Sequence, residues 1–244
     1  MGKISRINPI LEIARSSPQR IQKIWIQKDK REGRVEEIIR TAKAANIPLL
    51  FIPKKRLDQI ERDHQGAVAL VAMKEFVPLA SLLASSGVPF LVLLDGVEDP
   101  QNLGAIIRSA EGAGVDGIIL PERRAVGLTQ TVASVSAGAA EYVKIARVKN
   151  LARTIDVLKE SGIWVVGAEG DAPEPWYEFD YTLPVALVLG SEGKGLRPLI
   201  KKKCDKILSI PLLGRITSLN VASAASIFFF EVVRQRIKKE SKGG

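Results

Sequence analysis

The segment Leu94–Gly114 (LDGVEDPQNLGAIIRSAEGAG) constrains the fold more than any other, because it joins an apolar run to an amphipathic helix through a polar loop. The run that leads into it, PFLVLL, is typical of a strand buried on both faces. In the helix, Leu103, Ile106 and Ile107 recur at helical spacing, and Asn102 stands where a capping residue is expected. A buried strand that leads through a polar loop into a helix is the usual ligand-binding position of an open α/β sheet.

Strand and helix patterns alternate along the whole chain in two blocks, which predicts two α/β domains. The first domain is expected at residues 1–75, with strands at 21–27, 47–53 and 66–72 and helices at 8–15, 34–46 and 54–62. Residues 76–88 carry few charges and many small side chains, which is typical of a linker. Residues 89–244 form the second domain, in which the alternation predicts a mostly parallel sheet covered by helices on both faces. Its strands are expected at 90–94, 117–120, 142–145, 163–167, 184–189 and 206–210, with a proline-rich loop at 171–177.

The scarcity of cysteine and histidine excludes several classes of site. The 244 residues include one cysteine, Cys204, so no internal disulfide is possible, and with the single His64 a Cys/His zinc site is implausible. A Ser-His-Asp triad would have to use His64, which lies in an ordinary turn. No apolar run approaches the roughly 18 residues that span a bilayer, and the polar N-terminus does not resemble a secretory signal. We expect a cytoplasmic protein without metal or membrane contacts.

The positive charge of the chain is concentrated near its N-terminus. The formal net charge is +9, and residues 1–75 hold 16 Lys and Arg against 9 Asp and Glu, while the remainder holds 20 against 18. Such a distribution is what a surface for a phosphate backbone requires, but a solvated lysine-rich surface would produce the same pattern. Charge alone leaves both readings open.

Two later loops share the features of the first. GSEGKG (Gly190–Gly195) follows an apolar strand pattern, so its backbone amides can approach a ligand closely and Glu192 can supply a carboxylate, although a plain tight turn explains it as well. IPLLGRITSLN (210–220) precedes the last helix, which Ser218 or Asn220 can cap. The small residues and the three phenylalanines in that helix (222–230) predict that it is an interface as well as part of the core.

Taken together, the three loops resemble the successive motifs of the SpoU (TrmH-like) branch of the SPOUT methyltransferases. The motifs are DGVEDPQNLGAIIRSAEGAG, LVLGSEGKGL and IPLLGRITSLNVASAASIFFFE, and their order and spacing match across residues 89–238. The first 75 residues, with NPILEIA near the start and HQGAVAL at the end, are similar to the L30e-like RNA-binding domain of the subgroup that methylates ribosomal RNA. Departures are modest, such as Ala222 where a serine is common.

The resemblance implies a fold, a cofactor and a partner. The fold would be a C-terminal parallel-sheet α/β domain with a trefoil knot, joined to a small N-terminal L30e-like domain. The cofactor would be S-adenosylmethionine, and the chain would form a homodimer through its C-terminal domain. Residues that would hold the cofactor are Leu189, Gly190, Ser191, Gly195, Ile210, Leu212, Ser218, Leu219 and Asn220.

By the same resemblance, five residues surround the ribose that receives the methyl group: Asn102, Arg108, Glu192, Ser218 and Asn220. The family's proposed role for Arg108 is to activate the hydroxyl, but a guanidinium with a pKa above about 12 is a poor base, so a phosphate clamp that polarises the hydroxyl is the easier role. Glu192 would orient Arg108 or Asn102. In the N-terminal domain, phosphate contacts are expected from Arg20, Lys23, Lys28, Lys30, Arg31, Lys54, Lys55 and Arg56.

The reading that follows is an RNA 2′-O-ribose methyltransferase, with a guanosine of 23S ribosomal RNA as the expected substrate. Two alternatives stay open at this point. The same chemistry would serve another ribosomal site or a tRNA, and a non-catalytic RNA-binding assembly factor would keep the fold without the chemistry. The presence of Asn102, Arg108, Glu192 and Asn220 speaks against the second alternative.

Overall fold

The computed structural model describes residues 1–30, 32–84 and 87–243, and they form two compact units. The first unit contains Met1–Glu75 and Gly127–Tyr142, and the second contains Phe76–Val126 and Val143–Gly244. The sequence patterns placed 127–142 with the second domain, whereas its contacts here are with residues 1–75. The domain limits expected from the sequence, at residues 1–75, 76–88 and 89–244, stay a prediction. Within the described ranges, every helix is too short or too polar to span a lipid bilayer.

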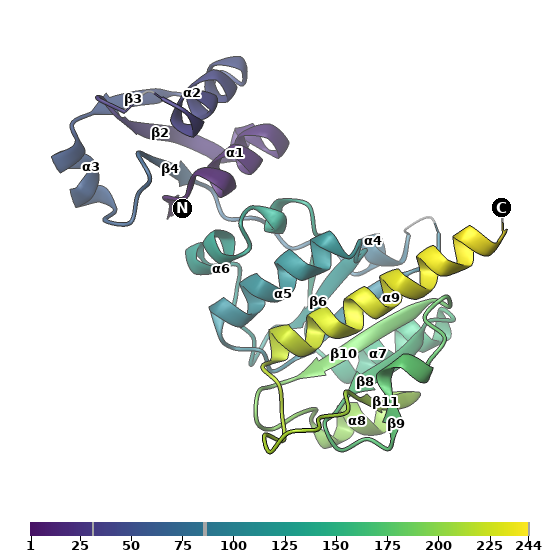
Figure 1. Cartoon of the computed structure of the whole chain (residues 1–244). Coiled ribbons are helices and arrows are strands. Elements are labelled where there is room, and N and C mark those ends of the chain that lie inside the picture. The colour runs from purple at the N-terminus through teal and green to yellow at the C-terminus, as the bar shows by residue number, and fades with distance from the viewer. Residues whose placement is uncertain (31, 85–86, 244) are drawn as a thin grey trace. The chain divides into compact units, whose positions relative to one another are not determined.

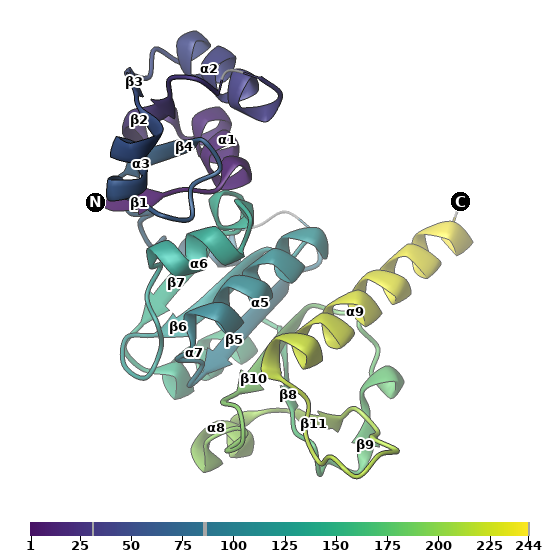
Figure 2. The same cartoon turned by 60° about the vertical axis from the view of Figure 1, so that its left-hand side comes forward.

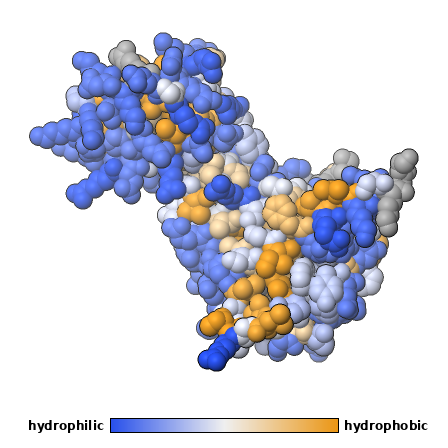
Figure 3. All heavy atoms as spheres, in the orientation of Figure 1, coloured by the Kyte–Doolittle hydropathy of each residue, from blue (hydrophilic) through white to orange (hydrophobic). Residues whose placement is uncertain are grey.

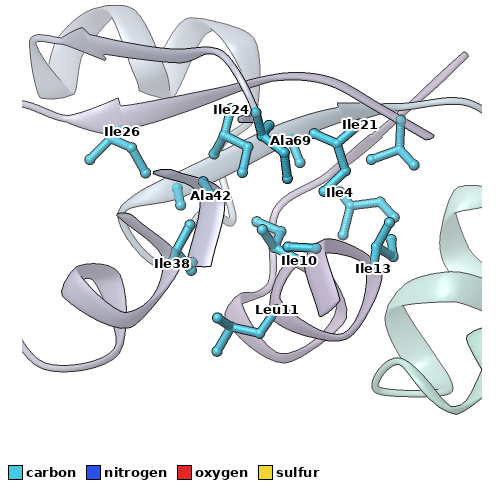
Figure 4. Packing of buried hydrophobic residues seen from close by; sticks show 14 of the residues in the cluster. Ile4, Ile10, Leu11, Ile13, Ile21, Ile24, Ile26, Ile38, Ala42 and Ala69 are labelled. Atoms are coloured by element: carbon cyan, nitrogen blue, oxygen red, sulfur yellow. The ribbon is translucent and has the colours of Figure 1, made fainter. Parts of the chain in front are cut away.

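A four-stranded sheet organises the first unit. Its strands are β1 (Gly2–Ile4), β2 (Ile21–Gln27), β3 (Leu49–Ile52) and β4 (Ala67–Val71), in the order β1-β4-β2-β3, and only the β2–β3 pair is parallel. Its helices are α1 (Ile7–Ser16), α2 (Arg34–Ala44), α3 (Lys54–Ile60) and α6 (Gln130–Val135). Isoleucines from the sheet pack against α1 and α2 to form the core of the unit (Figure 4). The expected strands and helices are present, but the short strand β1 was not predicted, since three residues are too few to show an alternation.

A seven-stranded sheet organises the second unit, and every strand pair in it is parallel, as the sequence predicted. The strands, in the spatial order β7-β6-β5-β10-β8-β11-β9, are β5 (Phe90–Asp95), β6 (Gly117–Pro121), β7 (Ile145–Val148), β8 (Trp164–Ala168), β9 (Glu174–Pro175), β10 (Val185–Gly190) and β11 (Lys206–Ser209). Strand β7 begins where the predicted strand 142–145 ends, and the two-residue β9 lies in a segment expected to be a loop.

Helices cover both faces of this sheet. Helices α5 (Pro100–Gly112) and α9 (Val221–Gly243) lie side by side on one face, while α7 (Leu151–Glu160) lies on the other (Figures 1 and 2). The two remaining helices, α4 (Ala80–Leu83) and α8 (Pro198–Lys203), join the core cluster on the α7 side. The Phe90 and Phe229 rings meet edge to face with centroids 5.8 Å apart, which fixes α9 on the central strand β5.

Candidate functional site

The candidate site lies where the two central strands end. Strands β5 and β10 are parallel neighbours, and their register pairs Asp95, the last residue of β5, with Gly190, the last residue of β10. The next strand in sequence, β6, lies on one side of β5, and β10 lies on the other. The order in which strands are added to the sheet therefore reverses between β5 and β10. Such a switch point is where open α/β sheets bind ligands.

A cleft of about 730 Å³ opens at this switch point. Its walls are the loop after β5, the loop after β10, the first turns of α5 and α9, and Arg124 from the loop after β6. The lining residues are Asp95, Gly96, Val97, Glu98, Asp99, Asn102, Arg124, Ser191, Glu192, Lys194, Gly195, Leu196, Arg197, Pro198 and Val221. The first two motif loops and the start of the last helix therefore share one cavity.

The glycine-rich loop is a closed turn that needs its glycines. Ser191 and Gly195 exchange two backbone hydrogen bonds of 3.1 and 3.0 Å, which close the loop on itself. A Cβ atom at Gly190 would lie 2.2 Å from the carbonyl carbon of Gly195, so no larger residue fits there. Gly193 and Gly195 have φ values of +79° and +62°, the left-handed region that glycine tolerates. The tight-turn and ligand-loop readings are compatible, because this turn also lines the cleft.

Two side-chain amides and one carboxylate form a hydrogen-bonded chain at the cleft, where Asn102 and Glu192 line it. The Asn220 side-chain oxygen accepts hydrogen bonds from the backbone amides of Ala222 at 2.9 Å and Ser223 at 3.3 Å, and so caps α9. This fixes the Asn220 amide nitrogen as a donor, and it donates to the Asn102 side-chain oxygen at 2.8 Å. Asn102 in turn donates to Glu192 at 3.2 Å. One residue from each of the three motifs is thus joined in a single network.

Asn102 is available for this network because another residue caps its helix. The sequence favoured Asn102 as the cap of α5, and this expectation is wrong: α5 begins at Pro100, and the Asp99 carboxylate accepts the capping bond from the Gln101 amide at 3.0 Å. Asp99 followed by proline at the first helical position is the better capping pair. Asn102 then lies in the first turn, with its side chain directed to the network.

An ion pair with a buried carboxylate and a partly exposed guanidinium holds the loop after β10 against the end of β5. The Asp95 carboxylate is fully buried, and it accepts hydrogen bonds from the Arg197 backbone amide at 2.9 Å and from the Arg197 guanidinium at 2.6 Å. The guanidinium contacts one carboxylate oxygen and the backbone amide donates to the other, so these charge-assisted bonds fix the position of Arg197 as well as adding energy. The sequence reasoning did not select either residue, since nothing in their spacing shows that they meet.

Two of the expected ribose-contacting residues stand apart from the network. Arg108 and Ser218 are exposed, and neither side chain forms a hydrogen bond or ion pair with any residue that the structure describes. Arg108 follows Asn102 by six positions on α5, which places it about 9 Å further along the helix axis and about 120° around it. Among the residues that the structure describes, the network therefore consists of Asn102, Glu192 and Asn220.

The loop before α9 has the properties of a cofactor-binding edge. In the parts of the chain that the structure describes, no backbone amide from Leu212 to Leu219 donates a hydrogen bond to another residue. Leu212 is half-buried, whereas Leu213, Ile216 and Leu219 are exposed. Uncommitted amides beside apolar side chains suit an adenine ring, which needs a flat apolar surface and a few hydrogen bonds. The residues present therefore fit S-adenosylmethionine.

The remaining residues expected at the cofactor occupy the strand ends beside this loop. Leu189 is buried inside β10, so its side chain supports the strand, while Gly190 and Ile210 are half-buried at the ends of β10 and β11. A Cβ atom at Gly170 would lie 3.3 Å from the Thr217 carbonyl oxygen, which shows that the loop before α9 runs close to the loop after β8. The strand ends and this loop form one continuous edge.

In the first unit, most of the predicted basic residues gather at one end of the sheet. Strands β2 and β3 are parallel, Gln27 pairs with Ile52, and the Lys28 amide donates to the Ile52 carbonyl at 2.9 Å. The exposed cations that follow these two strand ends therefore share an edge; they are Lys28, Lys30, Lys54, Lys55 and Arg56. We call these five residues the basic edge.

The other predicted basic residues are placed differently. Lys23 lies over the Trp25 ring at 5.0 Å, and Arg20 is committed to the Ala72 carbonyl and the Glu141 carboxylate within the first unit. Arg31 lies outside the described residues. His64 is buried in its turn, where it accepts from the Gly66 amide and bonds to Asp58, so it has a structural role.

The fold and the site together define a class of protein. The second unit has a parallel sheet covered on both faces, with a polar cleft at its switch point and uncommitted backbone amides beside it. This combination is typical of α/β proteins that bind nucleotide-like ligands. The model of the SpoU rRNA Methylase family matches residues 89–230, and a model described as RNA 2′-O ribose methyltransferase substrate binding matches residues 7–77. The chain belongs to the SpoU methyltransferase family.

Relatives and solved structures agree with this assignment. A protein assigned to the TrmH family of tRNA/rRNA methyltransferases, YacO of Bacillus subtilis, is 44% identical over 94% of both chains. The 23S rRNA (guanosine-2′-O-)-methyltransferase RlmB of Shewanella oneidensis is 43% identical over 94% of this chain and 96% of its own. The SpoU methyltransferase AviRb of Streptomyces viridochromogenes, solved with AdoMet, has a TM-score of 0.82 at 25% identity and covers 97% of this chain and 90% of its own. The protein is an RNA methyltransferase that uses S-adenosylmethionine.

Proposed function

We propose that the protein methylates the ribose 2′-hydroxyl of a guanosine in 23S ribosomal RNA. The observation that carries the proposal is the network of Asn102, Glu192 and Asn220 at the switch point, which presents amide and carboxylate groups to a hydroxyl beside the cofactor-binding edge. The printed activity of the Shewanella relative supports the choice of nucleotide and RNA.

The residues of the chain would divide the reaction between them. When bound, S-adenosylmethionine would supply the methyl group: the carbon–sulfur bond would break as the ribose oxygen bonds to the methyl carbon, S-adenosylhomocysteine would leave, and the hydroxyl proton would pass to solvent water. Asn102 and Asn220 hold the hydroxyl in line with that carbon, and Glu192 orients Asn102. Gly190, Ser191 and Gly195 present the loop that faces the cofactor, together with Ile210, Leu212, Ser218 and Leu219 from the following edge.

Arg108 would act on the RNA and not on the network. Its exposed guanidinium suits a clamp on the phosphate beside the reacting ribose, and from there it would polarise the hydroxyl without accepting its proton. We expect Arg108→Ala to abolish transfer and Arg108→Lys to restore part of the RNA affinity, measured as KM and kcat at saturating cofactor. Equal activity of wild type and Arg108→Ala would refute the assignment.

We infer further that the chain acts in the cytoplasm as a homodimer joined through the second unit. Exposed apolar side chains follow the loop before α9 and the outer face of that helix, where Figure 3 shows hydrophobic surface; they include Leu213, Ile216, Phe230 and Ile237. Light scattering after gel filtration should give twice the chain mass, and Phe230→Glu should shift the protein to monomer. A wild-type monomer would contradict the inference.

The basic edge of the first unit would recruit the RNA by its phosphates. Replacing Lys54, Lys55 and Arg56 with Gln should lower the slope of log Kd against log salt by about 2 to 3, since each lost phosphate contact removes about 0.7 to 0.9. Substitution is a cleaner test than removing residues 1–75, because 127–142 packs within the same unit and would lose its partner. An unchanged slope would refute the recruiting role.

The decisive experiment measures methyl transfer and its position. Purified protein should bind S-adenosylmethionine in calorimetry and transfer a labelled methyl group to unmodified 23S rRNA. Ribose methylation should then be mapped in RNA from cells with and without the protein. The cells without the protein should lack the methyl group on one guanosine of 23S rRNA. Methylation lost from a tRNA instead would overturn the substrate, and absence of cofactor binding at high micromolar concentration would overturn the enzyme activity itself.

A further inference from the structure

A second cleft adjoins the candidate site in the second unit. It has a volume of about 730 Å³ and lies at the same edge of the sheet, between the loops after β6 and β7 and the starts of α7 and α8. The two clefts share Arg124, Arg197 and Pro198, so they adjoin. Adjoining clefts can hold neighbouring parts of one extended ligand.

The second cleft is basic, whereas the first is mixed. Arg123, Arg124, Lys149 and Arg197 line it, and no carboxylate does among the described residues. Arg123, Arg124 and Lys149 are exposed, and within the described ranges none of them forms an ion pair or a side-chain hydrogen bond. The first cleft, in contrast, contains the carboxylates of Asp95, Glu98, Asp99 and Glu192.

Backbone features at the second cleft also favour an anion. Arg124, which lines both clefts, has φ +60°, a left-handed conformation that is uncommon outside glycine and that tends to persist where it serves a site. The cleft also takes in Leu151 and Ala152, whose amides belong to the first turn of the ten-residue helix α7, the positive end of its dipole. Asn150 caps this helix through the Arg153 amide at 3.1 Å, which leaves the first two amides uncommitted.

The chemistry of the two clefts assigns them to different ligands. S-adenosylmethionine carries a positively charged sulfonium and no phosphate, so a cleft lined by three cations that are unpaired in the described part of the chain, with Arg197 already paired to Asp95, disfavours it. An RNA strand carries one negative charge per nucleotide, and its phosphates lie immediately on both sides of the ribose that is methylated. Uncommitted guanidinium and ammonium groups next to the ribose network match that arrangement.

We propose that the cleft of Arg123, Arg124 and Lys149 binds the phosphates of the RNA strand next to the nucleotide held at the network of Asn102, Glu192 and Asn220. The proposal rests on the proposed function, since it assigns the path of that enzyme's substrate. It places a second RNA contact in the catalytic unit, separate from the basic edge of the first unit. It predicts that these residues set the affinity and salt dependence for RNA and leave cofactor binding unchanged.

The test uses the full-length protein with Arg123→Gln and Lys149→Gln combined, while Arg124 and Arg197 stay because they shape both clefts. The matched control combines Lys144→Gln and Lys202→Gln, two exposed lysines that do not line the cleft. Lys144 precedes β7 whereas Lys149 follows it, so Lys144 and Lys149 lie at opposite ends of that strand. Both proteins are titrated with unmodified 23S rRNA at several salt concentrations, with S-adenosylmethionine in calorimetry, and with inorganic phosphate.

The expected result is a slope of log Kd against log salt lowered by about 1.4 for the cleft variant, from about 0.7 per single-strand phosphate contact, with wild-type cofactor affinity. A variant that restores charge, Arg123→Lys with Lys149→Arg, should recover the slope. An unchanged slope, or an equal loss in the control, would overturn the proposal. Binding of inorganic phosphate that is lost in the variant while the RNA slope is unchanged would show a free-anion site and also overturn it. If the proposed function itself fails, the wild type transfers no methyl group, which none of these outcomes mimics.

Discussion

The double role of Asn220 leads to a prediction that separates stability from activity. Its side-chain oxygen caps α9, and its side-chain nitrogen donates to Asn102. Asn220→Ala removes both interactions. Loss of the cap costs about 1 kcal/mol, which lowers Tm by about 2 to 4 °C in a domain of this size. Loss of the network misplaces the acceptor hydroxyl, for which we expect a fall in kcat of about 100-fold or more.

Asn220→Asp removes only the second interaction. Aspartate is as good a cap as asparagine, and its negative charge suits a helix N-terminus, so Tm should stay at or slightly above the wild-type value. The carboxylate cannot donate to the Asn102 oxygen. If the Asn102 amide rotates to donate to Asp at position 220, its oxygen then faces Glu192, so one of the two hydrogen bonds is lost in either orientation.

The assay is methyl transfer to unmodified 23S rRNA at saturating S-adenosylmethionine, with thermal unfolding of the same preparations. The control is Ser223→Ala, an exposed side chain in the first turn of α9, which should leave both quantities unchanged. Wild-type kcat in a folded Asn220→Asp protein would refute the catalytic role of the network. An unchanged Tm in Asn220→Ala would refute the capping term.

Three further predictions concern stability and reactivity. Gly190→Ala places a methyl group against backbone 2.2 Å away, so Tm should fall by at least about 2 °C in thermal unfolding and cofactor affinity should fall in calorimetry, while Gly127→Ala, which meets open space, should change neither. Burial raises the pKa of the Cys204 thiol to about 12, so the folded protein should resist iodoacetamide at pH 8 and react once unfolded, as read by mass spectrometry; rapid labelling of the folded protein would contradict this. Hydrogen bonds from Arg234 lower the pKa of Glu231 in the folded state, so its stabilising contribution is present above the ordinary carboxyl pKa of about 4.3 and is lost as pH falls further. Glu231→Gln should therefore flatten the fall of Tm between pH 5 and 3, and an identical pH profile would exclude the effect.

The elements of the fold could be predicted from local patterns, because each buried strand of the second unit carries its own apolar run. Strand β5 is buried at every position and was predicted over 90–94, within one residue of its observed end at Asp95. The short strands β1 and β9 escaped prediction, since two or three residues carry no periodicity. The packing of 127–142 with the first unit also escaped it, because nothing in that stretch shows which core it meets.

The site could be predicted only as far as the motif loops themselves. Parallel strand ends meet at one edge, so the convergence of the loops after β5 and β10 follows from the predicted sheet. The bond between Asn102 and Asn220 spans 118 positions, and the one between Asp95 and Arg197 spans 102; both depend on strand order, which local patterns do not determine. The cap at Asp99 was missed for a simpler reason, because Asp99 and Asn102 are both good caps and only Asp99 immediately precedes the proline.

Asp99, and not Asn102, caps α5, which explains how the first motif can contribute a side chain to substrate binding. If Asn102 capped α5, its oxygen would be directed at the backbone amides of its own helix. Because Asp99 takes that role, the Asn102 amide keeps its donor and acceptor, and it links the start of α5 to the start of α9 and to the loop after β10. Three elements that meet only at the switch point are thereby tied through one side chain. In the proposed function, the cofactor-binding edge and the RNA-facing surface adjoin at this residue, so a shift of either loop would change the position of the acceptor hydroxyl.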